Sequence, residues 1–371
     1  MKDRMAKNTN EEKHQDNEMK KFCVFSGFLG SGKTTTMIAL TKYYSEHYGR
    51  AAMISNDLGH GVDLADDRLA RLSGCEASEI TDECICFIHD ELATRLDSYY
   101  DSGCELVISD IPGFGVGALE HVYFGLDEKY PGKYELGPFT VITEPEIVDA
   151  LRTGRNADMR YIRDFQLKEA DLIVLNKCDC ISEAQSAEYA EWLKENYPYA
   201  DVAVISALTG TGLDRLAQIL KEGRASLRHP DIDYESEELI AEMDSISEYY
   251  IQYYAAVCCN DFDGNDYLLD MAEQIRDKIH GAGFEVPHLK LLAWHDGGEY
   301  GKIDLIGTGR GVEKTHLFDS RCINLAVILN CSAACPADLL DSIITGTVKE
   351  VSADHDLELF IHKKECFNLG E

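Results

Sequence analysis

Positive charge, long apolar runs and clustered histidines are all scarce in this chain of 371 residues. It has 35 Lys and Arg residues against 67 Asp and Glu residues, which gives a formal net charge of −32. Nucleic acids and anionic lipid surfaces are bound mainly through clustered Lys and Arg side chains, so neither is expected as a partner. No apolar run approaches the ~18 residues that a membrane-spanning helix needs. The 12 histidines are scattered singly, which excludes a histidine-rich store of metal ions.

An apolar signal segment is also missing near the N-terminus. Residues 1–20 are polar and charged, and they lack the apolar core of a secretory signal. We therefore expect a mobile tail and a cytoplasmic protein. The chain has 13 cysteines, and in a reducing compartment we expect these to be thiols or metal ligands before disulfides.

Short apolar runs alternate with helix-length amphipathic segments between residues 21 and 227. Buried strands separated by crossover helices predict an α/β domain, with a mostly parallel sheet and helices on both faces. Such folds bind ligands beyond the carboxyl ends of their strands. The expected strands are Phe22–Ser26, Ala51–Ser55, Glu105–Asp110, Phe139–Thr143, Asp171–Asn176 and Asp201–Ser206. The expected helices are Thr34–His47, His89–Ser102, Met159–Glu169, Glu183–Asn196 and Leu213–Glu222.

An acidic segment at residues 228–244 is expected to be a linker to a smaller α+β domain at residues 245–371. The order strand, helix, three strands, helix, strand predicts a ferredoxin-like domain with one extra strand. The first expected strand, Glu248–Cys258, also fits a helix. The other expected elements are Tyr267–His280, His288–His295, Lys302–Ile306, Cys322–Leu329, Ala337–Lys349 and Leu357–Lys363.

A glycine-rich segment, Gly27–Thr34, fits the pattern G-x-x-x-x-G-K-[ST] and lies directly between an apolar strand and a helix. Glycines let backbone N–H groups surround a phosphate, and the positive end of the following helix adds to its attraction. Lys33 would reach the β- and γ-phosphates, and the Thr34 hydroxyl would bind Mg²⁺. The residues expected to bind nucleotide here are Gly30, Ser31, Gly32, Lys33, Thr34 and Thr35.

A second motif, Asp110-Ile-Pro-Gly113, ends the strand that follows in the expected sheet. An Asp110 carboxylate at a strand end can hold Mg²⁺ through water, and the Gly113 N–H can sense a γ-phosphate. The alternative for so short a pattern is a plain turn at the end of a strand.

Two more motifs predict how a nucleotide base would be recognised. Asn176-Lys177-Cys178-Asp179 fits N-K-x-D, and the Asp179 carboxylate can accept hydrogen bonds from N1–H and the 2-amino group of guanine. Adenine offers neither donor in that geometry, and an unpaired buried carboxylate is costly. Asn176 and Lys177 would brace the loop and cover the base. At the end of a later strand, a backbone N–H of Ser206-Ala207 can meet guanine O6, so the four motifs together predict a guanine-nucleotide site.

The segment G-F-L-G-S-G-K-T-T at Gly27–Thr35 and the N-K-x-D motif resemble the CobW/HypB/UreG family of GTPases, over Lys20–Leu227. This family assists metal centres and cobalamin enzymes. Its members carry an acidic residue after the second strand that helps to arrange Mg²⁺ and the attacking water. Asp57 occupies this position here, and the alternative is that Asn56-Asp57 only opens a turn.

Many CobW-type members also carry a C-x-C-C motif before the D-x-x-G strand. This chain has Cys84-Ile-Cys86-Phe87 there, so Phe stands in the third place. In an extended segment the two thiols would point the same way and share one ion, Zn²⁺ or Co²⁺. Cys75, His89 and His60 are near enough in sequence to complete the ligand set. The alternative is two ordinary, half-buried thiols.

Another cysteine pair, Cys331 and Cys335, joins an expected strand to an expected helix. A thiol near a helix N-terminus can have a lowered pKa, which would suit a redox role or a second metal site. The simpler interpretation is two thiols that face the core.

Together the motifs and the resemblance imply a protein that binds GTP or GDP with Mg²⁺ and hydrolyses GTP by in-line attack of water, with Lys33, Asp57 and Asp110 as catalytic residues. No catalytic Gln or Arg is identifiable, so we expect slow turnover that needs a partner or a second protomer. Hydrolysis would time the delivery of a metal ion or a corrinoid cofactor to a client protein. One alternative is a GTP-gated chaperone of a cobalamin-dependent enzyme that binds no metal itself. Another is a nucleotide-sensing regulatory module with negligible hydrolysis.

Overall fold

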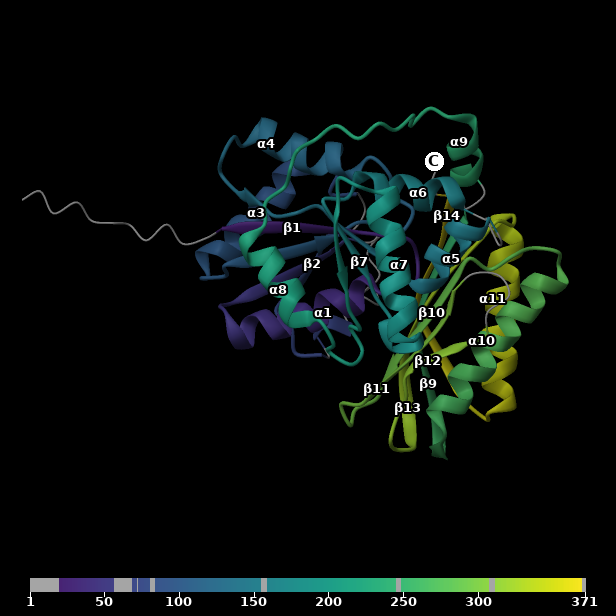
Figure 1. Ribbon diagram of the computed structural model, residues 1–371. Helices are drawn as coiled ribbons and strands as arrows, with labels where there is room; N and C mark the ends of the chain where they lie inside the picture. Colours follow the sequence, from purple (N-terminus) through teal and green to yellow (C-terminus); the bar gives the residue numbers. More distant parts are fainter. Residues whose placement is uncertain are drawn as a thin grey trace, which may run out of the picture.

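Two β-sheets, each packed against helices, make up the protein in the computed structural model (Figure 1), which describes residues 20–56, 69–71, 73–80, 84–154, 159–244, 248–306 and 311–368. The first sheet has the strand order β3-β2-β4-β1-β6-β7-β8, with β5 paired beside β1, and all its pairs are parallel. Its strands are β1 (Lys21–Ser26), β2 (Ala51–Asn56), β3 (Ala77–Ile80), β4 (Leu106–Asp110), β5 (Glu135–Leu136), β6 (Thr140–Thr143), β7 (Leu172–Leu175) and β8 (Asp201–Val204).

Helices cover both faces of this sheet, as the alternating pattern predicts. They are α1 (Lys33–His47), α3 (His89–Asp101), a π-helical turn (Leu119–Phe124) that continues into α4 (Gly125–Lys129), α5 (Pro145–Thr153), α6 (Arg160–Glu169), α7 (Glu183–Asn196) and α8 (Leu213–Glu222). The predicted α/β fold is therefore confirmed, whereas the short elements β3, β5, α4 and α5 were not predicted from the sequence.

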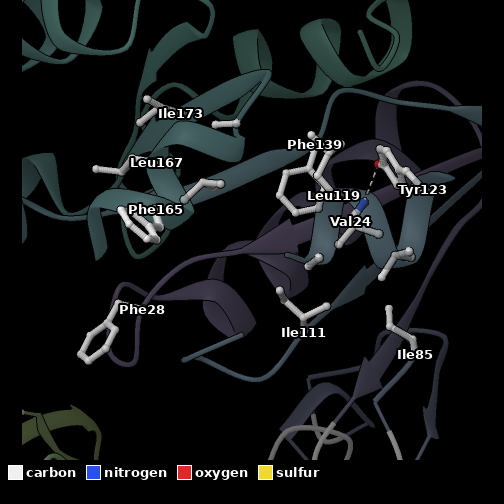
Figure 2. Packing of buried hydrophobic residues seen from close by; sticks show 14 of the residues in the cluster. Val24, Phe28, Ile85, Ile111, Leu119, Tyr123, Phe139, Phe165, Leu167 and Ile173 are labelled. Carbon is white, nitrogen blue, oxygen red and sulfur yellow. Dashed lines mark hydrogen bonds between the residues drawn. The ribbon is translucent and has the colours of Figure 1, made fainter. Parts of the chain in front are cut away.

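Strand β1 shows why this sheet needs helices on both sides. All six of its residues are buried, and successive side chains of a strand point to opposite faces. Phe22 and Val24 join the core under α3, α6 and α7, whereas Cys23 and Phe25 join the core under α1 and α8. Figure 2 shows the first of these cores, where the Val24 N–H donates to the Tyr123 hydroxyl at 2.9 Å.

The second sheet is antiparallel, with the strand order β12-β11-β10-β13-β9-β14. Strands β9, β10, β13 and β14 with the two helices form the predicted ferredoxin-like domain, and a hairpin of two strands, β11 and β12, extends it where one was expected. The elements are β9 (Glu248–Phe262), α10 (Gly264–Gly281), β10 (His288–Trp294), β11 (Tyr300–Ile306), β12 (Glu313–His316), β13 (Cys322–Ala333), α11 (Ala337–Asp354) and β14 (Glu358–Asn368).

The two faces of this second sheet meet different partners. Tyr250 and Tyr254 of β9 lie in a core with α10 and α11, so the strand interpretation of Glu248–Cys258 is confirmed and the helical one is wrong. Leu292 and Ile328 face the other way and join the core that contains α1 of the first domain. The second sheet thus packs between its own helices and the first domain, with α10 and α11 on the side away from it (Figure 1).

The expected linker at residues 228–244 contains a helix, α9 (Glu237–Asp244). The Glu242 carboxylate accepts hydrogen bonds from the N–H groups of Tyr161 and Ile162 at 3.1 and 2.9 Å. These N–H groups belong to the first turn of α6, where a carboxylate is stabilising. The connection is therefore attached to the first domain at this point. In the part of the chain that the structure describes, no helix is both long enough and apolar enough to cross a membrane.

Candidate nucleotide site between the two sheets

The loop between β1 and α1 has the shape that its glycines allow. Gly27, Gly30 and Gly32 have φ angles of +134°, +77° and +91°, a region that residues with a Cβ rarely adopt. A Cβ on Gly27 would lie 2.1 Å from the carbonyl oxygen of Ile142, and one on Gly32 would lie 2.4 Å from the side-chain nitrogen of Asn176. The loop therefore passes close to its neighbours, and only glycine fits at these two positions.

Helix α1 begins at Lys33, immediately after this loop, with no side-chain cap and no acidic residue in its first turn. Its first N–H groups and the positive end of its dipole are thus directed at the loop, which favours an anion there. The Lys33 ammonium donates to the carbonyl oxygen of Gly27 at 2.6 Å, so it is held over the loop.

Asp110 and Gly113 lie beside the same loop. Asp110 is buried at the end of β4, in register with Phe25 of β1, and accepts a hydrogen bond from the Asn56 N–H at 2.9 Å. A Cβ on Gly113 would lie 2.5 Å from the Leu29 side chain and 3.0 Å from the Leu29 nitrogen, so the D-x-x-G segment passes directly against the glycine-rich loop.

Thr34 and Asp110 line one cavity of about 270 Å³. A hydroxyl and a carboxylate are oxygen groups of the kind that Mg²⁺ prefers, so the donor chemistry fits this ion.

Asn176 joins three loops. It is buried at the end of β7, and its amide nitrogen donates to the Ser31 carbonyl at 3.0 Å, while its amide oxygen accepts from the Ala207 N–H at 3.0 Å. The Ser206 N–H donates to the Thr211 carbonyl at 2.9 Å. Both N–H groups predicted to meet guanine O6 therefore have partners inside the protein, and Ala207 would have to exchange its partner to bind the base.

Lys177 and Asp179 also line the cavity. Lys177 has a φ of +61°, and its ammonium lies 2.8 Å from Glu144 of the first domain and 3.8 Å from Glu313 of β12. Asp179 is exposed, and the Cys180 thiol lies 3.7 Å from its carboxylate. The carboxylate expected to recognise guanine is thus accessible from the cavity.

The cavity gathers most of the predicted nucleotide residues in one wall. Those that line it are Gly30, Gly32, Lys33, Thr34, Thr35, Asp110, Gly113, Asn176, Lys177, Asp179 and Ala207. Ser31 and Ser206 are buried behind this lining. Asp57 lies outside the described residues.

Two residues of α6 that sequence analysis missed support the D-x-x-G segment from below. The Gln166 side chain donates to the carbonyl oxygens of Gly113 and Gly115 at 3.1 and 3.0 Å. Glu169 is completely buried and accepts hydrogen bonds from the Gly117 N–H and, at 3.0 Å, from the Tyr234 hydroxyl. Burial raises the pKa of Glu169 to about 7, which these two hydrogen bonds only partly offset. No motif marks either residue in the sequence.

A glycine-rich phosphate loop at a strand–helix junction of a parallel sheet, with N-K-x-D at the same edge, defines the class of P-loop nucleotide-binding proteins. Residues 21–203 match the model of the CobW/HypB/UreG nucleotide-binding domain. The nucleotide-binding domain of this chain belongs to that family of GTP-binding proteins.

Individual relatives are distant. GTPase Obg 2 of Anaplasma marginale is 30% identical over 155 residues, 40% of this chain and 44% of that protein, so the chain spans less than half of the curated relatives it matches. The hydrogenase maturation factor HypB from Archaeoglobus fulgidus is 20% identical over 54% of this chain and 88% of that chain, with a TM-score of 0.39. The Zn(II)-bound YjiA GTPase from E. coli is 16% identical over 89% and 99%, with a TM-score of 0.37.

Cys84 and Cys86 are close together, but in a turn and not in the expected extended segment. The Phe87 N–H donates to the Cys84 carbonyl at 2.9 Å, which closes the turn and places the two sulfur atoms 2.9 Å apart. Their shared hydrogen bond lowers the pKa of Cys84, and the same bond together with burial raises that of Cys86. The two sulfur atoms therefore lie side by side.

The structure does not bring Cys75 or His89 to this pair. The Cys75 thiol lies 3.6 Å from the Ile38 carbonyl of α1, and the His89 ring lies 2.6 Å from the His121 carbonyl. Among the described residues no group of three His, Cys, Asp or Glu side chains is arranged to hold a metal ion. His60 lies outside the described residues.

Cys331 and Cys335 are buried in the core beneath α10 and α11. Burial raises the pKa of both thiols, the opposite of what a reactive thiol needs. The expectation of a lowered pKa is thus wrong for this pair, and the interpretation as core thiols fits. All 13 cysteines are free.

Proposed function

We propose that this protein binds and hydrolyses GTP, and that its nucleotide state controls the delivery of a metal ion, Zn²⁺ or Co²⁺, or of a metal cofactor to a client protein. The observation that supports this best is the single cavity shared by the phosphate loop and the N-K-x-D loop. Asn176 couples the two loops through hydrogen bonds to Ser31 and Ala207.

Specificity for guanine rests on Asp179. Its exposed carboxylate lines the cavity and can accept hydrogen bonds from the N1–H and the 2-amino group of guanine. Adenine has no donors in that arrangement, so its binding would displace water from the carboxylate and return no hydrogen bond.

Hydrolysis needs positioned charges more than covalent chemistry. The backbone N–H groups of the loop and the Lys33 ammonium would bind the phosphates, with Lys33 leaving the Gly27 carbonyl as they enter. Thr34 and Asp110 would hold Mg²⁺, which neutralises charge on the phosphate oxygens. The Gly113 N–H would contact the γ-phosphate, and Asp57 remains the candidate for arranging the attacking water.

Asn56 supports the coupling to a metal. Its N–H donates to Asp110 in the nucleotide site, and its side-chain oxygen accepts from the Ile85 N–H between the two cysteines, at 3.0 Å. A shift of Asp110 on loss of the γ-phosphate would therefore reach the Cys84–Cys86 turn through one residue. Two thiolates leave room for further ligands, which we propose come from the client or from a second protomer.

A second candidate is a GTP-gated chaperone of a cobalamin-dependent enzyme that binds no metal itself. It is favoured by Phe87, which replaces the third cysteine and is 72% exposed. An exposed aromatic side chain beside a nucleotide-linked turn suits contact with a client protein.

The test is a titration of the reduced protein with Zn²⁺ and Co²⁺, once with GDP and once with a non-hydrolysable GTP analogue. The variant Cys84→Ser/Cys86→Ser is compared with Cys259→Ser, since Cys259 is exposed on β9. Delivery of metal predicts affinities that differ by about tenfold or more between the nucleotide states, with loss of this difference only in the double variant. Weak metal binding that is the same in both nucleotide states and in the double cysteine variant would favour the second candidate.

A further inference from the structure

The second sheet supplies the other wall of the nucleotide cavity. His288 and Lys290 of β10, Lys302 and Asp304 of β11, and Asn330 of β13 line it opposite the phosphate loop. Four of them are buried and Lys290 is half-buried. Buried polar side chains are costly unless they have partners, so such a cluster on an otherwise apolar sheet face calls for a reason.

The register of the strands places this cluster in one row across the second sheet. Asp304, Lys290 and Asn330 are directly opposite one another across β11, β10 and β13. On the β12 side, Glu313 pairs with Asp304 and approaches Lys177 of the base loop.

At the other end of the row, Asn330 pairs with Ile251 of β9. Tyr249, two residues before Ile251, packs edge-on against Phe114, which directly follows Gly113 of the D-x-x-G segment. Lys290 is therefore midway between the loop that would bind the base and the loop that would sense the γ-phosphate.

Two lysines of this wall act on one buried carboxylate. The Lys302 ammonium lies 2.8 Å from the Asp304 carboxylate, which also accepts a hydrogen bond from Thr315 at 2.7 Å. Both Lys302 and Lys290 act on Asp304 and keep its pKa low despite its burial. Two ammonium groups thus flank one carboxylate in the wall that faces the phosphate loop.

One polar group in the wall still lacks a partner. The side-chain oxygen of Asn330 is buried, and no described residue forms a hydrogen bond with it. The oxygen and nitrogen of an amide are assigned from their surroundings, so one end of this amide is available to a ligand in either orientation.

We propose that the second sheet binds the nucleotide directly, with Lys290, assisted by Lys302, contacting phosphate oxygens of the nucleotide held by the glycine-rich loop. This inference rests on the proposed guanine-nucleotide function and adds a binding surface to it. Ammonium groups repel metal ions, so a bound polyanion explains the cluster better than a cation does. The second domain would then supply a cation for the phosphoryl group from within the same chain. No sequence motif identifies such a cation in the first domain.

The test measures the affinity of GDP and of a non-hydrolysable GTP analogue, using fluorescently labelled nucleotides. Lys290→Met keeps the aliphatic part of the side chain and removes the charge, so we expect both affinities to fall about tenfold. Asp304→Asn removes the opposing carboxylate and is expected to change affinity in the opposite direction. Lys349→Met, at an exposed position of α11 behind the sheet, is the matched control.

The opposite signs separate binding from folding, because a variant that only loosens the sheet would weaken binding in both cases. Thermal unfolding of each variant identifies damage to the fold, and Asp304→Asn keeps the test decisive if Lys290→Met does not fold. Unchanged affinity in Lys290→Met, or a fall in both variants, would overturn the inference. If the wild-type protein binds no guanine nucleotide, the proposed function itself fails. If it binds nucleotide and only Lys33→Ala abolishes this, the function stands without the second wall.

Discussion

Replacement of Glu169 by Gln should change how the stability of this protein depends on pH. Glu169 is completely buried under the D-x-x-G segment, and its pKa is raised from 4.5 to about 7 because burial disfavours the charged form. In the unfolded chain the carboxyl loses its proton near its ordinary pKa, whereas in the folded protein it keeps the proton up to about pH 7. Between these values the folded state binds more protons, so folding stability falls as the pH rises.

The magnitude follows from the shift. Each pH unit between the two pKa values costs about 1.4 kcal/mol, so the wild-type protein should lose about 2 kcal/mol between about pH 5.5 and about pH 8 through this group alone. Glu169→Gln cannot ionise, yet its side-chain oxygen can still accept from Gly117 and Tyr234. The free energy of unfolding of the variant, relative to wild type, should therefore rise by about 2 kcal/mol over this range.

Urea unfolding at several pH values measures this difference. Glu191→Gln is the control, because Glu191 is exposed on α7. Its replacement should leave the difference in unfolding free energy from wild type constant with pH. A difference in unfolding free energy between Glu169→Gln and wild type that stays constant with pH would contradict this prediction, since it would mean that Glu169 titrates alike in the folded and unfolded states. The comparison cancels the other carboxylates of this acidic chain.

Three further predictions, the first with its own control variant, test the geometry of the site and the attachment of helix α9. Gly32→Ala places a Cβ 2.4 Å from the Asn176 nitrogen at a φ of +91°, so it should destabilise the protein by about 1–3 kcal/mol and abolish nucleotide binding. Gly132→Ala, at a similarly positive φ of +65° but with no atom within 4 Å, should lower stability less and leave binding intact. Asn176→Ala leaves the Ser31 carbonyl and the Ala207 N–H without their partner. It should lower the free energy of unfolding, measured in urea, by about 2–4 kcal/mol. A change near zero would contradict the role of Asn176 in holding the loops together. Glu242→Ala removes the acceptor at the start of α6 and should lower the free energy of unfolding by about 1 kcal/mol. Faster proteolysis of residues 223–236 is the second readout. Unchanged stability and unchanged proteolysis would show that this attachment contributes nothing.

The phosphate loop shows what sequence analysis does well. The strand, the glycine-rich turn and the helix follow one another from Lys21 to His47. The local sequence pattern is therefore sufficient to predict the geometry of the loop. The N-K-x-D loop is equally local. By contrast, the turn at Cys84–Cys86 was expected to be extended, because two cysteines separated by one residue fit a strand as well as a turn.

The support beneath the D-x-x-G segment could not be predicted. Gln166 and Glu169 occupy a helix whose amphipathic pattern is ordinary, and their partners Gly113, Gly115 and Gly117 are about fifty residues away in the chain. Nothing near them in sequence indicates that this face of α6 lies under the nucleotide site.

By itself the sequence determined the class of both domains, the four nucleotide motifs and the order in which they reach one edge of the sheet. Periodicity and short motifs are local properties, and parallel strands necessarily bring their carboxyl ends together. Only the tertiary structure decided that His288, Lys290 and Asn330 face the nucleotide cavity while their neighbours face α10 and α11. Strand alternation defines two faces, but which face meets which partner depends on how two whole domains bury their apolar surfaces against each other.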